Sequence, residues 1–514
     1  MLPKADNHWT ILEAAHLLNR AGFGGSPQEI KALHALGREK AVDSLLGAAE
    51  EPAASPLPTW ANTEQAIADM RMRMEQRRDL MKSTRGLSAE QAEEKRREAN
   101  KEMQRENRER ALEAQAWWFR RMLNTTSPLR EKMTLFWHDH FATSIQKVKQ
   151  PVLMMNQNEL FRKNAFGSFK DLTQAILMDP AMLLYLDTEN SRKGRPNENF
   201  AREVMELFTL GEGHYTEQDI REAARAFTGY QLSRSTGNVT HARKQWDETD
   251  KTIFGKTGPF NGSDVINMIF EKPRPARFMA EKLWEFFVYD KPTSAALDML
   301  SATLDKADHQ IAPLLREIFL SKEFYSEASI RSQIKSPVQF LITLFKQLEI
   351  TNPPNGFPIN AEQQLGQILF MPPNVAGWDW GQAWINTNTL LTRYNLAGFL
   401  TKGSFQNAND SKGDDDSMEM MERVKTPGMA RAPKLMGRNW KGPDYEKITP
   451  RPLREKPEEL VDSLIFRFFQ GTLPDKARGS FIEYAVSKKG VVFTDSETAE
   501  LCHLILSTPY YQLC

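Results

Sequence analysis

Apolar residues recur along this chain with the spacing of amphipathic α-helices, and only one short region alternates like a β-strand. Between Thr10 and Arg20 the apolar positions lie three or four residues apart. Ser-Pro pairs at Ser26, Ser127 and Ser336 each open a further helix, because serine caps a helix and proline suits its first turn. The pattern predicts a mainly α fold: a multi-helix globular assembly with one small β-hairpin region and an inserted charged helical hairpin.

The inserted hairpin is predicted where charge replaces the amphipathic pattern. Segments 63–84 and 88–124 lack proline, and Gly86 followed by Ser88 marks a helix stop and a new N-cap. The second arm carries glutamate and lysine or arginine four residues apart on several faces, which is typical of a solvated helix. Such an arm is either an inserted surface hairpin or a protruding element that binds a partner or forms a dimer.

The predicted β region lies between residues 231 and 262. Strands at 239–243 and 251–255 flank a turn-rich stretch, which predicts a hairpin. Shifts in composition then divide the chain. We expect N-terminal core helices over 1–49, a linker and the charged hairpin over 50–124, a main helical core over 125–402, a flexible linker or surface excursion over 403–456, and a small helical unit over 457–514.

Composition and charge narrow the functional classes. Lys plus Arg and Asp plus Glu both number 67, so the net charge is zero and does not favour nucleic acid or an anionic membrane as partner. No apolar run approaches the roughly 20 residues of a membrane span. The first residues contain no apolar signal-peptide core, which favours the cytoplasm, while export alongside a signal-bearing partner stays open. The two cysteines, Cys502 and Cys514, are too few for a disulfide framework.

The densest group of chemically reactive side chains falls in the stretch 197–230, predicted as two capped helices joined by a glycine-containing loop. In the first helix Glu198, Arg202 and Glu206 are four residues apart and would share one face, with Glu203 three residues before Glu206. If this face were buried, the arginine would keep both carboxylates ionised, which suits metal ligands better than a general acid. Three interpretations stay open: a functional cleft, a buried structural polar network and a solvated face.

Histidines would supply further ligands or acid–base groups. His214 lies in the loop between the two helices, and His138 and His140 lie on the helix that begins after Ser127. Helical spacing places His140 toward the core and His138 on roughly the opposite side, so the two cannot bind one ion while the helix is regular. A carboxylate-bridged metal site usually also takes a Glu-x-x-His pair from a partner helix, and the stretch contains none.

Aromatic residues gather between positions 365 and 394. Trp378, Trp380 and Trp384 follow the proline pair at 372–373. Exposed tryptophans near asparagines can form a platform for sugars, whereas a proline-kinked loop more often packs its tryptophans on the core.

Seven motifs in order resemble the bacterial domain-of-unknown-function 1800 family. From about residue 10 to the C-terminus they read AHLLNRAGFGGSPQEI, LREKMTLFWHDHF, NENFAREVMELFTLGEGHYTEQDIREAARAFTGY, KTIFGKTGPFNG, KSPVQFLITLF, LGQILFMPPNVAGWDWGQAWINTNTLLTRYN and HLILSTPYYQLC. The resemblance implies a mostly helical bacterial protein, often encoded beside a sulfatase-like protein with an export signal.

The resemblance also implies which polar positions recur in the family. The family pattern places a histidine directly before Asp247, where this chain has Trp246. If that histidine is an essential ligand or base, this chain is either inactive or uses His241 instead. The recurrent positions fall on His138, His140, Asn197, Glu198, Asn199, Arg202, Glu203, Glu206, Asp219, Arg225 and Asp247.

Two functional hypotheses follow. The first is a metal-assisted hydrolase. The second is a non-catalytic binding or assembly module that acts with the sulfatase-like partner through the charged hairpin and the tryptophan segment. In the first, the catalytic groups are Glu198, Arg202, Glu203, Glu206 and His214, and a divalent metal is held by His138, His140, Glu198 and Glu206.

Overall fold

The computed structural model shows a helical protein. It describes residues 1–48, 55–233, 236–289, 291–353, 356–402, 442–471, 473–488 and 493–514, so most of the predicted linker 403–456 lies outside the described residues. Within these ranges helices dominate, and the strands form two small antiparallel sheets, which confirms the predicted mainly α fold. None of the described helices combines the length and the hydrophobicity needed to cross a membrane.

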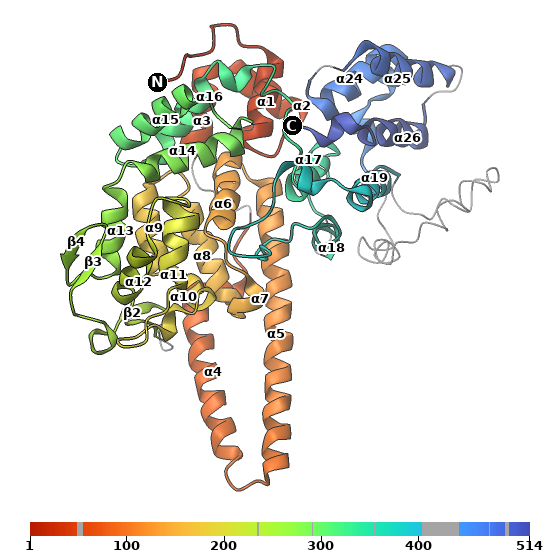
Figure 1. Cartoon of the computed structure of the whole chain (residues 1–514). Helices are drawn as coiled ribbons and strands as arrows, with labels where there is room; N and C mark the ends of the chain where they lie inside the picture. Colours follow the sequence, from red (N-terminus) through yellow and green to blue (C-terminus); the bar gives the residue numbers. More distant parts are fainter. Residues whose placement is uncertain are drawn as a thin grey trace.

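One end of the molecule is built from the first helices and a later set (Figure 1). Capping boxes begin the first two helices, because the side chains of Thr10 and Ser26 accept hydrogen bonds from the backbone of Glu13 and Glu29. Contacts between α3 and α16 join the two sets. The helices are α1 (Ile11–Ala21), α2 (Pro27–Ala35), α3 (Arg38–Gly47), α14 (Arg274–Phe287), α15 (Ser294–Lys306) and α16 (Ile311–Leu320).

The charged hairpin projects from the body (Figure 1). It consists of α4 (Thr63–Ser83) and α5 (Ala89–Asn124), with Gly86 at φ 95° in the turn and Ser88 capping α5. Near the body the arms are tied by ion pairs from Arg73 to Glu106 (3.3 Å) and from Arg110 to Asp69 (2.7 Å). The end of α5 is different, because its tryptophans are buried against α6, α17 and α18.

Helix α6 (Pro128–His140) runs through the interior and is buried on every side. It contacts α1, α3, α5 and α8 (Pro151–Lys163). A buried charge network fixes this crossing. Glu131 of α6 accepts hydrogen bonds from Arg162 of α8 at 2.5 and 3.0 Å, from Arg121 of α5 at 2.8 Å and from the Trp118 indole at 3.1 Å. The network joins three helices through one carboxylate.

The signature stretch and the β region occupy one side of the body (Figure 1). The strand pairing differs from the prediction, because 239–243 and 251–255 do not pair with each other. Phe254 and Gly255, both with positive φ, form a two-residue turn inside the predicted second strand and reverse the chain there. The pairs are β1 (Tyr230–Leu232) with β2 (Val239–His241), and β3 (Lys251–Ile253) with β4 (Lys256–Gly258).

The remaining helices complete the body around α6 and form the C-terminal unit. Around the signature stretch lie α7 (Ile145–Val148), α9 (Phe169–Leu177), α10 (Pro180–Tyr185) and α13 (Gly262–Phe270). The later part contains α17 (Pro337–Gln347), α18 (Gly356–Leu365), α19 (Thr387–Lys402), α22 (Tyr445–Ile448), α23 (Arg451–Arg454), α24 (Pro457–Phe469), α25 (Asp475–Ser487) and α26 (Asp495–Leu506). Helix α19 packs on α26, which attaches the C-terminal unit to the body.

Candidate functional site

The first signature helix is not a regular α-helix. It begins at Asn199, with Glu198 rather than Asn197 at the N-cap position. After α11 (Asn199–Glu203) it changes into the π-helix η3 (Val204–Thr209), where the amide of Leu210 bonds to the carbonyl of residue 205, five positions earlier. The wider turn rotates the following side chains relative to an α-helix. The predicted Glu198–Arg202 pair is present, and Glu206 acts on Arg202 through its charge, with no ion pair between these two among the described residues. Short π segments occur frequently at functional sites.

Arg202 connects the two signature helices. Its guanidinium donates two hydrogen bonds of 3.0 Å to Glu217, the first residue of α12 (Glu217–Ala226), and lies 3.4 Å from Glu198. Its side chain is 36% exposed, so Arg202 is neither sealed in the core nor fully solvated. The hydrogen bonds to Glu217 raise the pKa of Arg202, which stays charged. This partial exposure argues against the buried polar network and leaves the functional cleft and the solvated face open.

Glu203 and Glu206 form a second group beside Arg202. The carboxylate of Glu206 accepts a 2.6 Å hydrogen bond from the Tyr215 hydroxyl. Burial and the nearby charge of Glu206 raise the pKa of Glu203, and Arg202 only partly offsets this shift. Burial, with a smaller effect from Glu203, also raises the pKa of Tyr185 in α10. The charge of one carboxylate thus acts on the other where α11 becomes π-helical.

His214 lies in the exposed loop after η3. Partial burial and the charges of Arg274 and Lys272 lower its pKa, so it is neutral at neutral pH. Arg274 also holds this loop by donating a 2.7 Å hydrogen bond to the carbonyl of Leu210. No described hydrogen bond links His214 to the glutamates, and its predicted catalytic role stays a prediction.

Arg225, near the end of the second signature helix, forms one ion pair with the β region and one within its own helix. Arg225 bonds to Asp247 at 2.9 Å and to Glu222 at 2.7 Å. Burial favours a higher pKa for Asp247, but hydrogen bonds from Arg225 and Thr249 outweigh it and hold the pKa at about 2. Trp246, in the place of the expected histidine, packs edge-on against His241, whose ring nitrogen lies 3.2 Å from the Thr228 carbonyl. These contacts give both residues a packing role.

His138 is sealed in the core. The sequence predicts a core-facing position for His140. Its side chain is surrounded by aromatic rings of Trp118, Phe161, Phe370 and Trp378. Burial lowers its pKa to about 3. Both histidines lie inside the protein because α6 is surrounded by other elements on nearly every side, so the side opposite His140 is also core.

His140 lies on another side of α6. Its Nε2 is 2.9 Å from the carbonyl of Phe208 in η3, and its ring stacks on Phe136. Burial and the charge of Lys282 lower its pKa to about 3. Glu198 and Glu206 are engaged by Arg202 and Tyr215, away from both histidines. In the described ranges no three His, Cys, Asp or Glu side chains converge to hold an ion, so the four predicted ligands do not fit a shared metal.

Sequence reasoning missed Asp139, between the two histidines. It is 8% exposed, and burial raises its pKa to about 7 against opposing hydrogen bonds and the charge of Lys282. Its Oδ1 accepts a 2.7 Å hydrogen bond from the backbone of Trp378, and the Trp380 side chain also donates to it. Gly377, at φ 88°, makes room for the Asp139 carboxyl group. A β-carbon at this position would lie only 2.4 Å from Oδ1. Asp139 therefore anchors the tryptophan segment on α6.

The tryptophans of this segment divide between core and surface. Trp378 and Trp384 are buried, whereas Trp380 is 50% exposed and packs edge-on against Phe286. The core-packing interpretation therefore holds for two of the three tryptophans.

Comparison with known proteins supplies the family. The family model described as a protein of unknown function, DUF1800, matches residues 16–513. The chain belongs to the DUF1800 family. This confirms the resemblance carried by the seven motifs and adds no reaction to it. No curated protein and no solved structure matches the chain.

Proposed function

We propose that this DUF1800 protein is a hydrolase that uses Glu203 and Glu206 as a general acid and a general base. The observation that carries the proposal is their placement, with Glu203 as the last residue of α11 and Glu206 in the π-helical turn that follows, where the charge of Glu206 acts on Glu203. Pairs of carboxyl groups whose environments differ commonly divide the acid and base roles between them. The raised pKa of Glu203 suits the general acid, which donates a proton to the leaving group. Glu206, which accepts the Tyr215 hydrogen bond, is placed to take a proton from water.

Charge around the pair indicates the class of substrate. Arg202 is the cation beside the Glu203–Glu206 pair. It feels the negative charges of Glu198, Glu206 and Glu217, and it already donates hydrogen bonds to Glu217. An anionic substrate would meet this acidic face unfavourably, whereas a neutral hydroxylated substrate would find hydrogen-bond acceptors there. We therefore propose neutral glycoside-like substrates. No step passes through a metal, because the predicted ligands do not converge.

The test is a hydrolysis screen of the purified protein. Chromogenic glycosides, esters, phosphates and sulfates are compared for the wild type, Glu206→Gln and the control Glu271→Gln. The control removes an exposed carboxylate that pairs only with Lys256. We expect turnover of a neutral glycoside, a loss of about 10²–10⁴-fold in Glu206→Gln, and no change in the control. Equal turnover in all three proteins, or preference for the anionic esters, would contradict the proposal.

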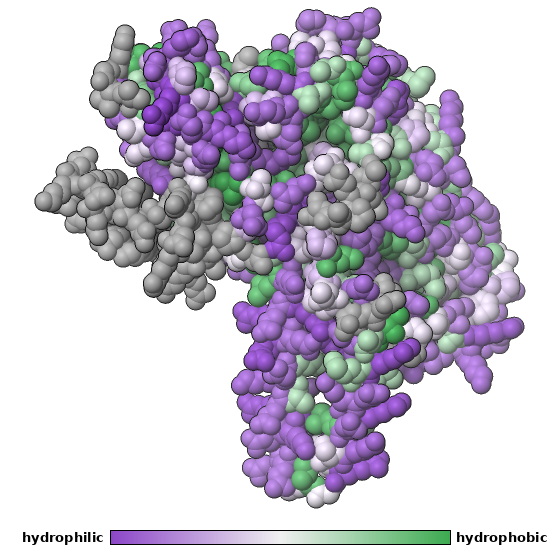
Figure 2. All heavy atoms as spheres, turned by 180° about the vertical axis from the view of Figure 1, so that it is seen from behind, coloured by the Kyte–Doolittle hydropathy of each residue, from purple (hydrophilic) through white to green (hydrophobic). Residues whose placement is uncertain are grey.

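A second candidate function rests on the projecting hairpin. Its arms reach beyond the body, and its surface is mostly hydrophilic with scattered hydrophobic side chains near the end (Figures 1 and 2). Exposed methionines on the two arms are Met81, 63% exposed, and Met72 and Met103, each 45% exposed. Exposed methionines suit an adaptable protein contact. In this alternative the protein is an assembly module for the sulfatase-like neighbour, and its export alongside that partner follows from the same proposal.

Co-purification tests the alternative. The sulfatase-like protein encoded nearby is co-expressed with the full chain and with a variant in which residues 68–108 are replaced by a short Gly-Ser linker. Recovery with the full chain and loss with the variant would support the module. Equal recovery with both would reject the hairpin as the contact.

A further inference from the structure

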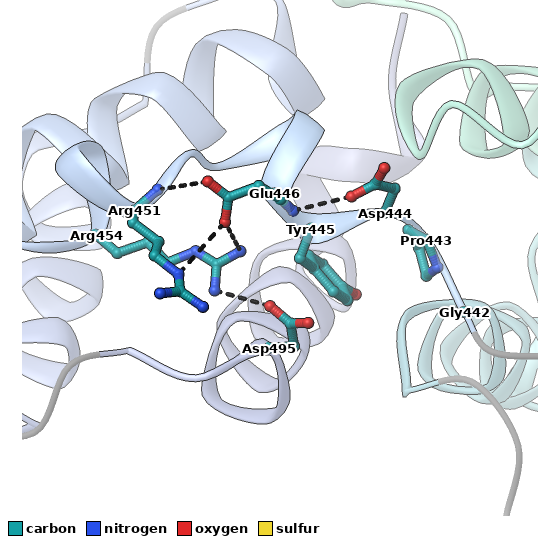
Figure 3. A pocket seen from close by; sticks show the side chains of 8 residues that line it. All are labelled: Gly442, Pro443, Asp444, Tyr445, Glu446, Arg451, Arg454 and Asp495. Atoms are coloured by element: carbon teal, nitrogen blue, oxygen red, sulfur yellow. Dashed lines mark hydrogen bonds and ion pairs between the residues drawn. The ribbon is translucent and has the colours of Figure 1, made fainter.

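An open cavity of about 770 Å³ lies in the C-terminal unit, away from the signature helices (Figure 3). The short helices α22 and α23 border it on one side and the start of α26 on the other. Its lining is polar and contains two arginines. The lining residues are Gly442, Pro443, Asp444, Tyr445, Glu446, Arg451, Arg454 and Asp495.

Arg454 is a buried cation with one unused donor group. Its side chain is 4% exposed. The Nε atom donates to the carbonyl of Thr449 at 2.6 Å, and Nη1 donates to Asp495 at 2.7 Å and to the carbonyl of Phe493 at 3.3 Å. The buried Nη2 has no hydrogen-bond partner within the described structure. Since buried donors are nearly always paired, this atom is open to a further acceptor.

Arg451 provides a second guanidinium at the same place. Oε2 of Glu446 lies 3.8 Å from Nη2 of Arg454 and 3.8 Å from Nε of Arg451. Both distances exceed a hydrogen bond, so one carboxylate balances two cations without satisfying either. Figure 3 shows the two guanidinium groups side by side, facing Glu446. Glu446 is 59% exposed, and its other oxygen, Oε1, accepts a 3.3 Å hydrogen bond from the backbone N–H of Arg451. It is an internal competitor for any anion that enters.

We propose that this cavity binds a tetrahedral oxyanion, a phosphate or sulfate group on a hydroxylated molecule, between Arg451 and Arg454. Guanidinium groups suit such anions because their N–H fork matches two oxygens at once. The incoming group takes the unused Nη2 donor of Arg454 and displaces Glu446. Asp444 and Asp495 at the rim accept hydrogen bonds from hydroxyls of the same molecule.

Calorimetric titration of the full chain tests the proposal. The probes are inorganic phosphate, inorganic sulfate, glycerol 1-phosphate and glycerol, at constant ionic strength. We expect glycerol 1-phosphate to bind more tightly than inorganic phosphate and glycerol alone not to bind. Comparing phosphate with sulfate shows which oxyanion the site prefers.

Variants locate the binding. Arg451→Gln is expected to weaken glycerol 1-phosphate binding by at least about tenfold, and Glu446→Gln to tighten it by about tenfold through loss of the competitor. Arg478→Gln is the matched control, because Arg478 belongs to the same unit but pairs with Asp462. Arg454→Lys keeps the buried charge and removes Nη2, and it should weaken binding while circular dichroism shows a folded chain. No binding to the wild type and Glu446→Gln at about 20 mM, or equal binding to Arg451→Gln, overturns the proposal. Neither result bears on the Glu203–Glu206 pair.

Discussion

Asp139→Asn tests how the structure places the Trp-His-Asp-His-Phe motif. Burial raises the pKa of Asp139 from 3.8 to about 7, a difference of about three units. One unit corresponds to about 1.4 kcal/mol, so the ionised carboxylate costs the folded state about 4 kcal/mol above pH 7. Because the pKa is raised in the folded state, the contribution of the protonated Asp139 to the free energy of unfolding is complete below pH 3.8. This contribution is lost as the pH rises through 7.

Asparagine removes this titration while its amide oxygen can still accept from the backbone of Trp378. The variant should gain stability relative to the wild type by about 1.6 kcal/mol at pH 5 and about 4 kcal/mol at pH 8, apart from a constant offset. With about 2.1 cal/mol/K of unfolding entropy for each of 514 residues, 4 kcal/mol corresponds to about 4 °C in Tm.

Differential scanning calorimetry at pH 5, 6.5 and 8 measures the difference in Tm between variant and wild type. The control is Asp298→Asn, an exposed carboxylate paired with Arg277. A difference that does not change between pH 5 and pH 8 would refute the reasoning, because Asp139 would then be ionised throughout.

Three further predictions concern stability. Glu131→Gln should lower the free energy of unfolding, measured in urea, by about 3–5 kcal/mol, because it leaves Arg162 buried without its main counterion. The control Arg316→Gln, at an exposed ion pair, should lower it by less than about 1 kcal/mol. Gly377→Ala should lower the free energy of unfolding by about 2–4 kcal/mol, since its β-carbon would meet Asp139 at a positive φ, while Gly479→Ala, with open space around it, should not. Glu203→Gln should raise Tm relative to the wild type more at pH 8 than at pH 4, because the raised pKa of Glu203 makes its ionised form the costly one; an equal shift at both pH values would argue against that environment.

Local signals in the sequence predicted much of the fold. Caps at Ser26, Ser88 and Thr216 form as their spacing predicts, because a capping box is decided within four residues. The projecting hairpin was predictable for the same reason, since Gly86 and the charge pattern act locally. The pairing of the β region was not, because its turn uses Phe254, a residue that rarely adopts positive φ.

The site was less predictable because it depends on geometry beyond one helical turn. The periodicity of the signature helix is the same in sequence whether its hydrogen bonds span four residues or five, so nothing marked the π segment that separates Glu206 from the Arg202 ladder. His138 and Asp139 gain their environments from the tryptophan segment more than 230 residues later. The unused donor of Arg454 becomes visible only when all its partners are known.

The pH dependence of kcat/KM tests the acid–base pair most directly. It is measured on a glycoside with a good leaving group and on one with a poor leaving group. With the poor leaving group, the wild type should lose activity at high pH as Glu203 gives up its proton, and Glu203→Gln should lose both this alkaline limb and most of its rate. With the good leaving group, Glu203→Gln should keep most activity, while Glu206→Gln should be impaired on both. An alkaline limb that persists in Glu203→Gln would contradict the account.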